Sequence, residues 1–301
     1  MDQAWDVIVI GAGVAGLSAA ETVARGGLRC LCIDKVGPGG VLINLAALHD
    51  CPGLAPGTTG PDLVATLTEA ATDAGVEMGF GEVTSLGGGG PWTVATDDAT
   101  HTARAVVVAT GLAPGRLGID DEARFEGKGL SHCAACDGPL YAGQTVVVDG
   151  SDKWALQEAV ELAETSGHVT LTIGDARLDV ADPRTHHVAA LLNATIVPGR
   201  VVALNGADGL DSVVIERDGR RSTLEARAVF AYAGRRPDLG FAAGALAQDS
   251  TSRIAVDEDM RAGAPSLFAA GDARAGASER VAEAIADGRR AGQSVLRALS
   301  A

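Results

Sequence analysis

The sequence lacks a hydrophobic run long enough to cross a membrane, because none approaches the roughly 18 apolar residues that a spanning helix needs. The apolar run near the N-terminus is also too short for a signal peptide. Basic residues are scarce, since 24 lysines and arginines face 39 acidic residues and leave a net charge of −15. This charge repels phosphate backbones and anionic lipids, so we expect neither a nucleic-acid nor a membrane partner.

Cysteines are also few, and their number of five is odd. A disulfide-rich secreted domain is therefore excluded, and we expect a cytoplasmic location. Cys30 and Cys32 lie in an apolar strand pattern and read as structural thiols, whereas the role of Cys51 stays open. With 47% hydrophobic residues the chain is too apolar to be disordered, and its 301 residues suit one large domain or two smaller ones.

Short apolar strands alternate with alanine-rich helical stretches. The predicted strands cover residues 6–10, 28–34, 103–111, 145–150, 168–175, 226–234 and 266–272. Continuous apolar strands in this alternation are typical of parallel sheets covered on both faces. The strand–turn–helix unit occurs near residues 6 and 145, so the fold class is α/β with two Rossmann-like, three-layer nucleotide-binding domains. The glycine run at 87–91 predicts a turn between antiparallel strands.

The first strand leads into a glycine fingerprint. Gly11, Gly13 and Gly16 open a helix, and Asp34 ends the next strand. Such glycines let a pyrophosphate approach the backbone at a helix N-terminus, while the acid can accept from a ribose hydroxyl. Alone, the motif also suits an ordinary glycine-rich turn. The apolar strand that ends in Gly271-Asp272 supplies a second element, and the pair predicts FAD binding.

The third motif is a Cys-x-x-Cys pair, Cys133 and Cys136, followed by Asp137. Such a pair can close a reversible disulfide, and the acid can exchange a proton during the interchange. A zinc site would need four ligands, yet the sequence has no second pair and only His132 beside the first. Buried inert cysteines are a further alternative, and redox chemistry is the favoured interpretation.

Together these motifs resemble the low-molecular-weight thioredoxin reductases, which are flavin-dependent pyridine nucleotide-disulfide oxidoreductases. The resemblance rests on GAGVAG (11–16), GGVL (39–42), CPG (51–53), ATG (109–111), HCAACDG (132–138), AGRRP (233–237) and LFAAGD (267–272). It implies an FAD-binding domain of residues 1–112 and 238–301. It also implies an inserted, NADPH-domain-like domain of residues 113–237 that carries the cysteine pair, and a homodimer.

The resemblance assigns a role to each matching residue. It places Cys136 next to the flavin, Cys133 at the substrate disulfide, and Asp137 as the general acid or base. The residues that it places around FAD are Gly11, Gly13, Gly16, Asp34, Lys35, Gly40, Val41, Leu42, Asp50, Val83, Ala109, Thr110, Gly111, Gly271, Asp272, Arg280, Val281 and Ala282. The family usually has glutamine where Val41 and Val281 stand, and asparagine where Asp50 stands.

The inserted domain departs from the family where NADPH would bind. The second fingerprint glycine is replaced by Asp152, and the family's arginine cluster becomes Ile173-Gly174-Asp175, with Asp179 at the third arginine position. We therefore predict that NADPH does not bind in the usual mode. Asp175 could accept from an NADH ribose, but Asp152 would still face the phosphates.

The favoured function is an FAD-dependent disulfide or dithiol oxidoreductase that uses the Cys133/Cys136 pair. Its substrate would be a thioredoxin-like protein or a small molecule, and its other redox partner ferredoxin, oxygen or another flavin. The net charge disfavours an acidic ferredoxin unless charge is segregated. The alternatives are a conventional NADPH-dependent thioredoxin reductase, a dithiol oxidase that forms disulfides with oxygen, and a non-catalytic redox-sensing flavoprotein.

Overall fold

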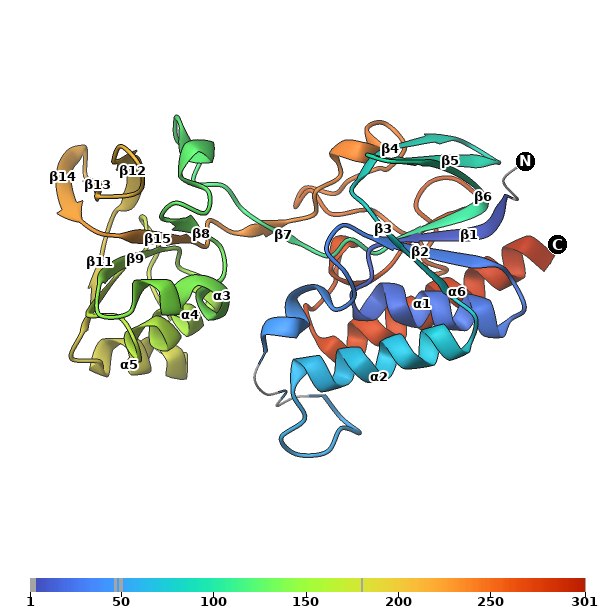
Figure 1. The fold of residues 1–301 in the computed structure, drawn as a ribbon, viewed down its shortest axis with the longest axis horizontal. Coiled ribbons are helices and arrows are strands. Elements are labelled where there is room, and N and C mark those ends of the chain that lie inside the picture. The colour runs from blue at the N-terminus through green and yellow to red at the C-terminus, as the bar shows by residue number, and fades with distance from the viewer. Residues whose placement is uncertain (1–3, 46–47, 49–50, 180, 301) are drawn as a thin grey trace. The chain divides into compact units, whose positions relative to one another are not determined.

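The computed structural model describes residues 4–45, 48, 51–179 and 181–300 (Figure 1). Asp50 therefore lies outside the described residues. The chain divides into two compact units, one of residues 1–113 with 236–301 and one of residues 114–235. It passes between them through β7 (Ala113–Pro114) and β16 (Arg235–Arg236), which pair with each other. Among the described residues no helix is long and apolar enough to span a membrane.

The first unit is built on a seven-stranded sheet in the order β3-β2-β1-β6-β5-β4, with β17 also paired to β6. Its strands are β1 (Trp5–Ile10), β2 (Cys30–Asp34), β3 (Glu77–Phe80), β4 (Val83–Gly88), β5 (Trp92–Thr96), β6 (Thr100–Val108) and β17 (Leu267–Ala269). Pairing is parallel except between β4, β5 and β6. The β4–β5 hairpin turns within the glycine run at 87–91, as predicted.

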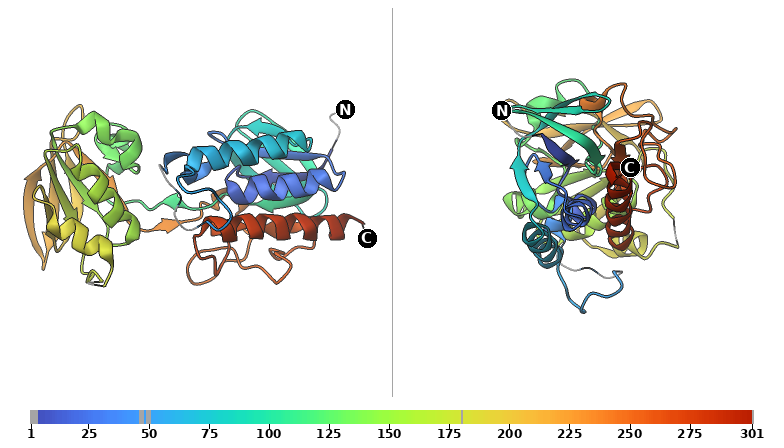
Figure 2. Two further views of the ribbon diagram at one scale, coloured as in Figure 1. Left: turned by 90° about the horizontal axis from the view of Figure 1, so that it is seen from below. Right: turned by 90° about the vertical axis from the view of Figure 1, so that its right-hand side faces the viewer.

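Three helices cover one face of this sheet: α1 (Val14–Arg25), α2 (Gly60–Asp73) and α6 (Val281–Ser300). Helix α1 packs against both others, and the three lie side by side in Figure 2. Alternate residues of β1 enter different cores, with Val7 and Val9 under the helices and Ile8 and Ile10 against β4, β5 and the segment 239–273. Because both faces of β1 are covered, its sequence is continuously apolar.

The second unit has a parallel sheet in the order β11-β10-β9-β15-β8. These strands are β8 (Leu130–Ser131), β9 (Thr145–Asp149), β10 (His168–Thr172), β11 (Ala194–Val197) and β15 (Ala228–Ala231). One face carries α3 (Ala134–Asp137), α4 (Lys153–Ala163) and α5 (Pro183–Ala190). The other carries an antiparallel sheet of β12 (Arg200–Asn205), β13 (Ser212–Arg217) and β14 (Arg220–Glu225).

Short 3₁₀ helices complete the fold: η1 (Gly40–Asn44), η2 (Glu122–Phe125), η3 (Gly138–Tyr141), η4 (Gly240–Ala242) and η5 (Gly271–Ala273). Both units are three-layered α/β structures, the first around a mixed sheet with a parallel core and the second around a parallel sheet. The predicted fold class, with two Rossmann-like units, is confirmed. Cys30 and Cys32 are free and lie in the core, where burial raises the pKa of the Cys30 thiol to about 12.

A candidate redox site and two dinucleotide turns

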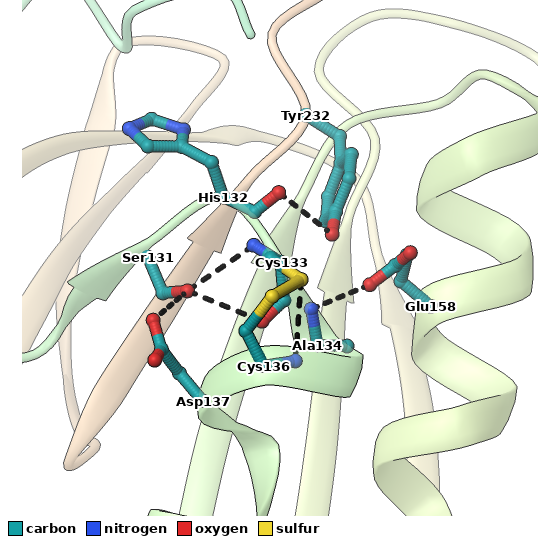
Figure 3. The surroundings of a disulfide bond; sticks show 8 residues. All are labelled: Ser131, His132, Cys133, Ala134, Cys136, Asp137, Glu158 and Tyr232. Carbon is teal, nitrogen blue, oxygen red and sulfur yellow. Dashed lines mark hydrogen bonds between the residues drawn. A yellow bond between two sulfur atoms is a disulfide. The ribbon is translucent and has the colours of Figure 1, made fainter. Parts of the chain in front are cut away.

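Cys133 and Cys136 form a disulfide at the start of α3 (Figure 3). The backbone N–H of Cys136 donates to Cys133 Sγ at 3.2 Å, so the first cysteine also caps the short helix. Cys133 is half-buried and Cys136 is exposed. A disulfide on such a turn can open and close by thiol–disulfide exchange without rearrangement of the sheet behind it.

Ser131 links Asp137 to the disulfide turn. Its hydroxyl donates to Asp137 Oδ2 at 2.7 Å and accepts from the backbone N–H of Cys133 at 3.2 Å. The carboxylate is therefore held, through Ser131 of β8, at the same turn as the disulfide. This position suits the proton exchange that the sequence predicts for Asp137.

Sequence reasoning missed two side chains at the disulfide, Glu158 and Tyr232. The backbone N–H of Ala134 donates to Glu158 Oε2 at 2.7 Å, and the hydroxyl of Tyr232 donates to the carbonyl oxygen of His132 at 3.3 Å (Figure 3). Burial raises the pKa of Tyr232, and the charge of Glu158 and a hydrogen bond to it raise this pKa further.

A signal for Glu158 exists in the sequence. The buried residues of α4 are Ala155, Leu156, Ala159 and Leu162, and Glu158 falls on the same stripe by helical spacing. An acid on the apolar face of a helix needs a partner, and here the partner is the backbone of the disulfide turn. Tyr232 carries no comparable signal.

The glycine fingerprint of the first unit has the geometry of a phosphate-binding turn. Gly11 has a φ of +100°, and a Cβ there would collide with the carbonyl oxygen of Ala109. A Cβ on Gly16 would collide with the carbonyl oxygen of Gly11, so this glycine lets α1 pack closely against the turn. No atom lies within 4 Å of a Cβ built on Gly13, so the start of α1 is open where a pyrophosphate would approach.

Asp34 and the loop that follows it border this turn. The backbone N–H of Ala12 donates to Asp34 Oδ2 at 2.8 Å, while the N–H groups of residues 36 and 37 donate to Oδ1 at 3.0 Å each. The loop brings Gly40 within 3.7 Å of Gly13 Cα, measured from a Cβ built on Gly40. Lys35, Gly40 and Val41 are exposed, and Leu42 is buried.

The segments 109–111 and 270–272 reach the same edge of the sheet. The N–H of Ala109 donates to the carbonyl oxygen of Ile10 at 2.8 Å, and the N–H of Ala270 donates to that of Val108 at 3.0 Å. Gly271 has a φ of +70°, and a Cβ there would lie 2.7 Å from the Cβ of Ala15. The carboxyl ends of β1, β6 and β17 therefore meet at the start of α1.

The other residues predicted to contact FAD lie farther from the fingerprint turn at the start of α1. Asp272 is half-buried in η5, Arg280 and Ala282 are exposed at the start of α6, and Val281 packs against the helix-side core. Val83 begins β4 and packs against the core on the opposite face of the sheet. The structure thus brings the three glycines, Asp34, Gly40, 109–111 and Gly271 together, and it separates Val83 from them.

The first unit fits a dinucleotide such as FAD. Thr110 Oγ1 is buried at the sheet edge and has no hydrogen-bond partner among the described residues, so it can donate to a bound group. The open backbone at Gly13 and the N-terminus of α1 suit the pyrophosphate. The residues that would hold FAD are those of the fingerprint turn, the loop after Asp34, and the ends of β6 and β17.

The corresponding turn of the second unit is closed by its own side chain. Asp152 caps α4, because its Oδ1 accepts from the backbone N–H groups of Trp154 and Ala155 at 3.0 and 2.9 Å. The guanidinium carbon of Arg235 lies 4.8 Å from the centre of the Trp154 ring, a distance typical of cation–π contact. The N–H groups that would donate to a phosphate at this helix start therefore already donate to Asp152.

The loop after β10 carries Arg177, but the positions expected to hold the arginine cluster are Ile173, Gly174, Asp175 and Asp179. Asp175 and Asp179 are exposed there, and Asp179 Oδ1 accepts from the N–H of Ala181 at 2.8 Å. Within the part of the chain that the structure describes, no group of three or more His, Cys, Asp or Glu side chains could hold a metal ion.

The family model, the relatives in sequence and the similar structures all point to one family of proteins. The model of the family described as pyridine nucleotide-disulphide oxidoreductase matches residues 5–288. The thioredoxin reductase of Treponema pallidum is 33% identical over 298 residues, which cover 96% of this chain and 95% of that protein. The crystal structure of Lactococcus lactis thioredoxin reductase (FR conformation) superposes with a TM-score of 0.88 at 27% identity and covers 98% of this chain and 99% of that one. For T. acidophilum thioredoxin reductase the TM-score is 0.86 at 26% identity, with both chains fully covered.

Proposed function

Because the chain belongs to the pyridine nucleotide-disulphide oxidoreductase family, in its low-molecular-weight thioredoxin reductase branch, we propose a disulfide oxidoreductase that does not use NADPH in the usual way. Family membership makes the chain an FAD-dependent flavoprotein oxidoreductase that acts on a sulfur group. FAD, when bound, supplies two-electron transfer to or from a dithiol. The nature of the other electron donor or acceptor is the new part of the proposal.

The cap at Asp152 is the observation that carries this proposal. A bound phosphate would have to displace the carboxylate from two backbone N–H groups and then lie beside its charge. Two like charges at about 4 Å repel by roughly 4 kcal/mol at an effective dielectric constant of about 20. Asp175 and Asp179 add further negative charge where a 2′-phosphate would need arginines.

Within this proposal the disulfide turn performs the exchange with substrate. The Cys133 thiolate attacks a substrate disulfide and forms a mixed disulfide, and Cys136 then displaces the substrate as a dithiol while the Cys133–Cys136 bond closes. Two electrons pass to the substrate, and Asp137 returns a proton to the leaving sulfur. The names of the curated relatives support a thioredoxin-like protein as the substrate. We also propose a cytoplasmic homodimer, in keeping with the few cysteines and the family resemblance.

The test is an anaerobic visible spectrum of the holoprotein during titration with NADPH, then NADH, then dithiothreitol. We expect neither nucleotide to bleach the flavin within seconds and dithiothreitol to bleach it through the disulfide. Stoichiometric bleaching by NADPH would overturn the proposal and identify a conventional thioredoxin reductase. Reoxidation of the reduced protein by oxygen, with disulfide formation in an added dithiol, would instead assign the oxidase reaction.

A further inference from the structure

The backbone of the disulfide turn is tied to a carboxylate from a different element. Ala134 follows Cys133 directly, and its N–H donates to Glu158 Oε2 of α4 at 2.7 Å. Ala134 is buried and Glu158 is half-buried, so the contact is partly shielded from water. Hydrogen bonds to a charged acceptor are about twice as strong as neutral ones. The contact therefore fixes the turn in the conformation in which the disulfide is closed.

The same contact places the Glu158 carboxylate on the backbone N–H of the residue that follows Cys133. Reduction converts the disulfide into two thiols, one of which ionises first, and backbone N–H groups of the turn can donate to the thiolate. The Cys136 N–H already donates to Cys133 Sγ, but the Ala134 N–H is directed to Glu158 instead. A thiolate at Cys133 would therefore lack one donor and face a carboxylate across a single residue.

We propose that Glu158 is a positioning residue of the redox pair, which holds the turn in its disulfide form and, through its charge, disfavours the thiolate formed on opening. It acts through the backbone of Ala134 and through Tyr232, whose ring packs in the same core and whose hydroxyl reaches the carbonyl of His132. Because the reduced form is disfavoured relative to the disulfide, the reduction potential of the pair is lower. The dithiol therefore delivers electrons to a substrate disulfide more readily than an isolated Cys-x-x-Cys turn would.

Other charges around the turn do not duplicate this contact. Helix α4 and η3 pack against α3, and their titratable side chains are Lys153, Glu158 and Glu161 of α4 and Tyr141 of η3. The turn itself contributes Asp137, which is held by the hydroxyl of Ser131. Glu158 is the carboxylate that accepts from the backbone of the Cys-x-x-Cys segment among the described residues.

The experiment measures the equilibrium between the disulfide of the holoprotein and dithiothreitol. The protein disulfide gains two electrons and two protons to become two thiols, while dithiothreitol closes to its cyclic disulfide. Acid quenching, alkylation and mass spectrometry of the peptide that carries both cysteines give the two populations at pH 6 and pH 9. The variants are Glu158→Gln, which keeps the acceptor and the shape but removes the charge, and the matched control Glu164→Gln on the exposed end of the same helix.

At pH 9 we expect Glu158→Gln to shift the equilibrium constant toward the dithiol by roughly tenfold, since one nearby charge is worth on the order of one pKa unit. At pH 6, where the thiols stay protonated, only the loss of the charge-assisted hydrogen bond acts, so the shift should be clearly smaller than at pH 9. The ionisation of dithiothreitol cancels in their ratio. Glu164→Gln should match the wild type at both pH values.

Two results would overturn the inference: equal constants for Glu158→Gln and Glu164→Gln, or a shift of the same size at both pH values, which would indicate a change of packing alone. The inference rests on the proposed redox role of the pair but not on the identity of the electron donor. A flavin that NADPH bleaches would refute the proposed donor and leave the effect of Glu158 intact. A wild-type disulfide that dithiothreitol cannot reduce would refute both.

Discussion

At the scale of single residues, Asp152 both stabilises a helix and excludes a ligand. Replacement of an aspartate N-cap by glycine costs only a few tenths of a kcal/mol, so Asp152→Gly should fold normally. The variant frees the N–H groups of Trp154 and Ala155 and removes a charge. We expect its affinity for NADH to rise by about tenfold or more, and that for NADPH to rise less, because Asp175 can accept from a ribose but repels a 2′-phosphate. Calorimetric titration of the holoprotein measures both affinities.

The matched control is Asp182→Gly, since Asp182 caps α5 in the same way by accepting from the N–H of Arg184. It loses a cap without opening the nucleotide turn, so its nucleotide affinity should equal that of the wild type. If Asp152→Gly also binds no nucleotide, the cap is not what excludes the phosphates, and the argument from Asp152 fails.

Some residues of the candidate site could be identified from the sequence and others could not. Asp152 could be singled out because the fingerprint fixes which position must approach a phosphate. Asp137 could be singled out because it adjoins the cysteines. Glu158 and Tyr232 reach the disulfide only because β9, β15 and α4 pack together. The helical spacing marks Glu158 as an acid on an apolar face but does not identify its partner, and no local pattern marks Tyr232.

At the scale of elements, the predicted strands lie where the structure has them, but several predicted ends are too late. The strand predicted at 103–111 is β6 (Thr100–Val108), and the one predicted at 266–272 is β17 (Leu267–Ala269). In both cases the apolar pattern continues past the last strand residue to a glycine with a positive φ, Gly111 or Gly271. The pattern alone does not distinguish a last strand residue from the first residue of a turn.

The α1 turn supports a prediction that separates packing from ligand contact. Gly16→Ala forces a methyl group against the carbonyl of Gly11, and overpacking of this kind typically costs about 1–3 kcal/mol. Gly13→Ala meets nothing within 4 Å and has an extended backbone that alanine tolerates. We expect both variants to retain less FAD after gel filtration, but only Gly16→Ala to lower the melting temperature of the FAD-stripped protein. If FAD-stripped Gly16→Ala melted at the same temperature as the FAD-stripped wild type, the packing role of Gly16 would be contradicted. If Gly13→Ala retained all of its FAD, the approach of the pyrophosphate at this turn would be contradicted.

At the scale of the whole molecule, the order of motifs predicted two nucleotide-binding units, because each strand–turn–helix start needs its own sheet. Each of the four apolar core clusters lies within one of the two units. The core under α1 combines residues near both ends of the chain, such as Val7 and Val295. The strand and helix pattern alone does not show this pairing, which arises because β17 returns to β6 and α6 returns to α1.

This division of the cores predicts that the units fold separately. Residues 114–235 contain all members of two clusters, so this fragment should unfold cooperatively in urea and retain a reducible Cys133–Cys136 disulfide without flavin. Residues 1–113 alone lack α6 and should not fold. Joined by a glycine–serine linker to residues 236–301, they should give a yellow protein, because β7 and β16 pair and the two ends therefore lie close together. Circular dichroism and the flavin absorbance test each fragment. A 114–235 fragment without cooperative unfolding would mean that its cores depend on the first unit. A colourless linked protein would mean that FAD binding by the first unit depends on the second unit.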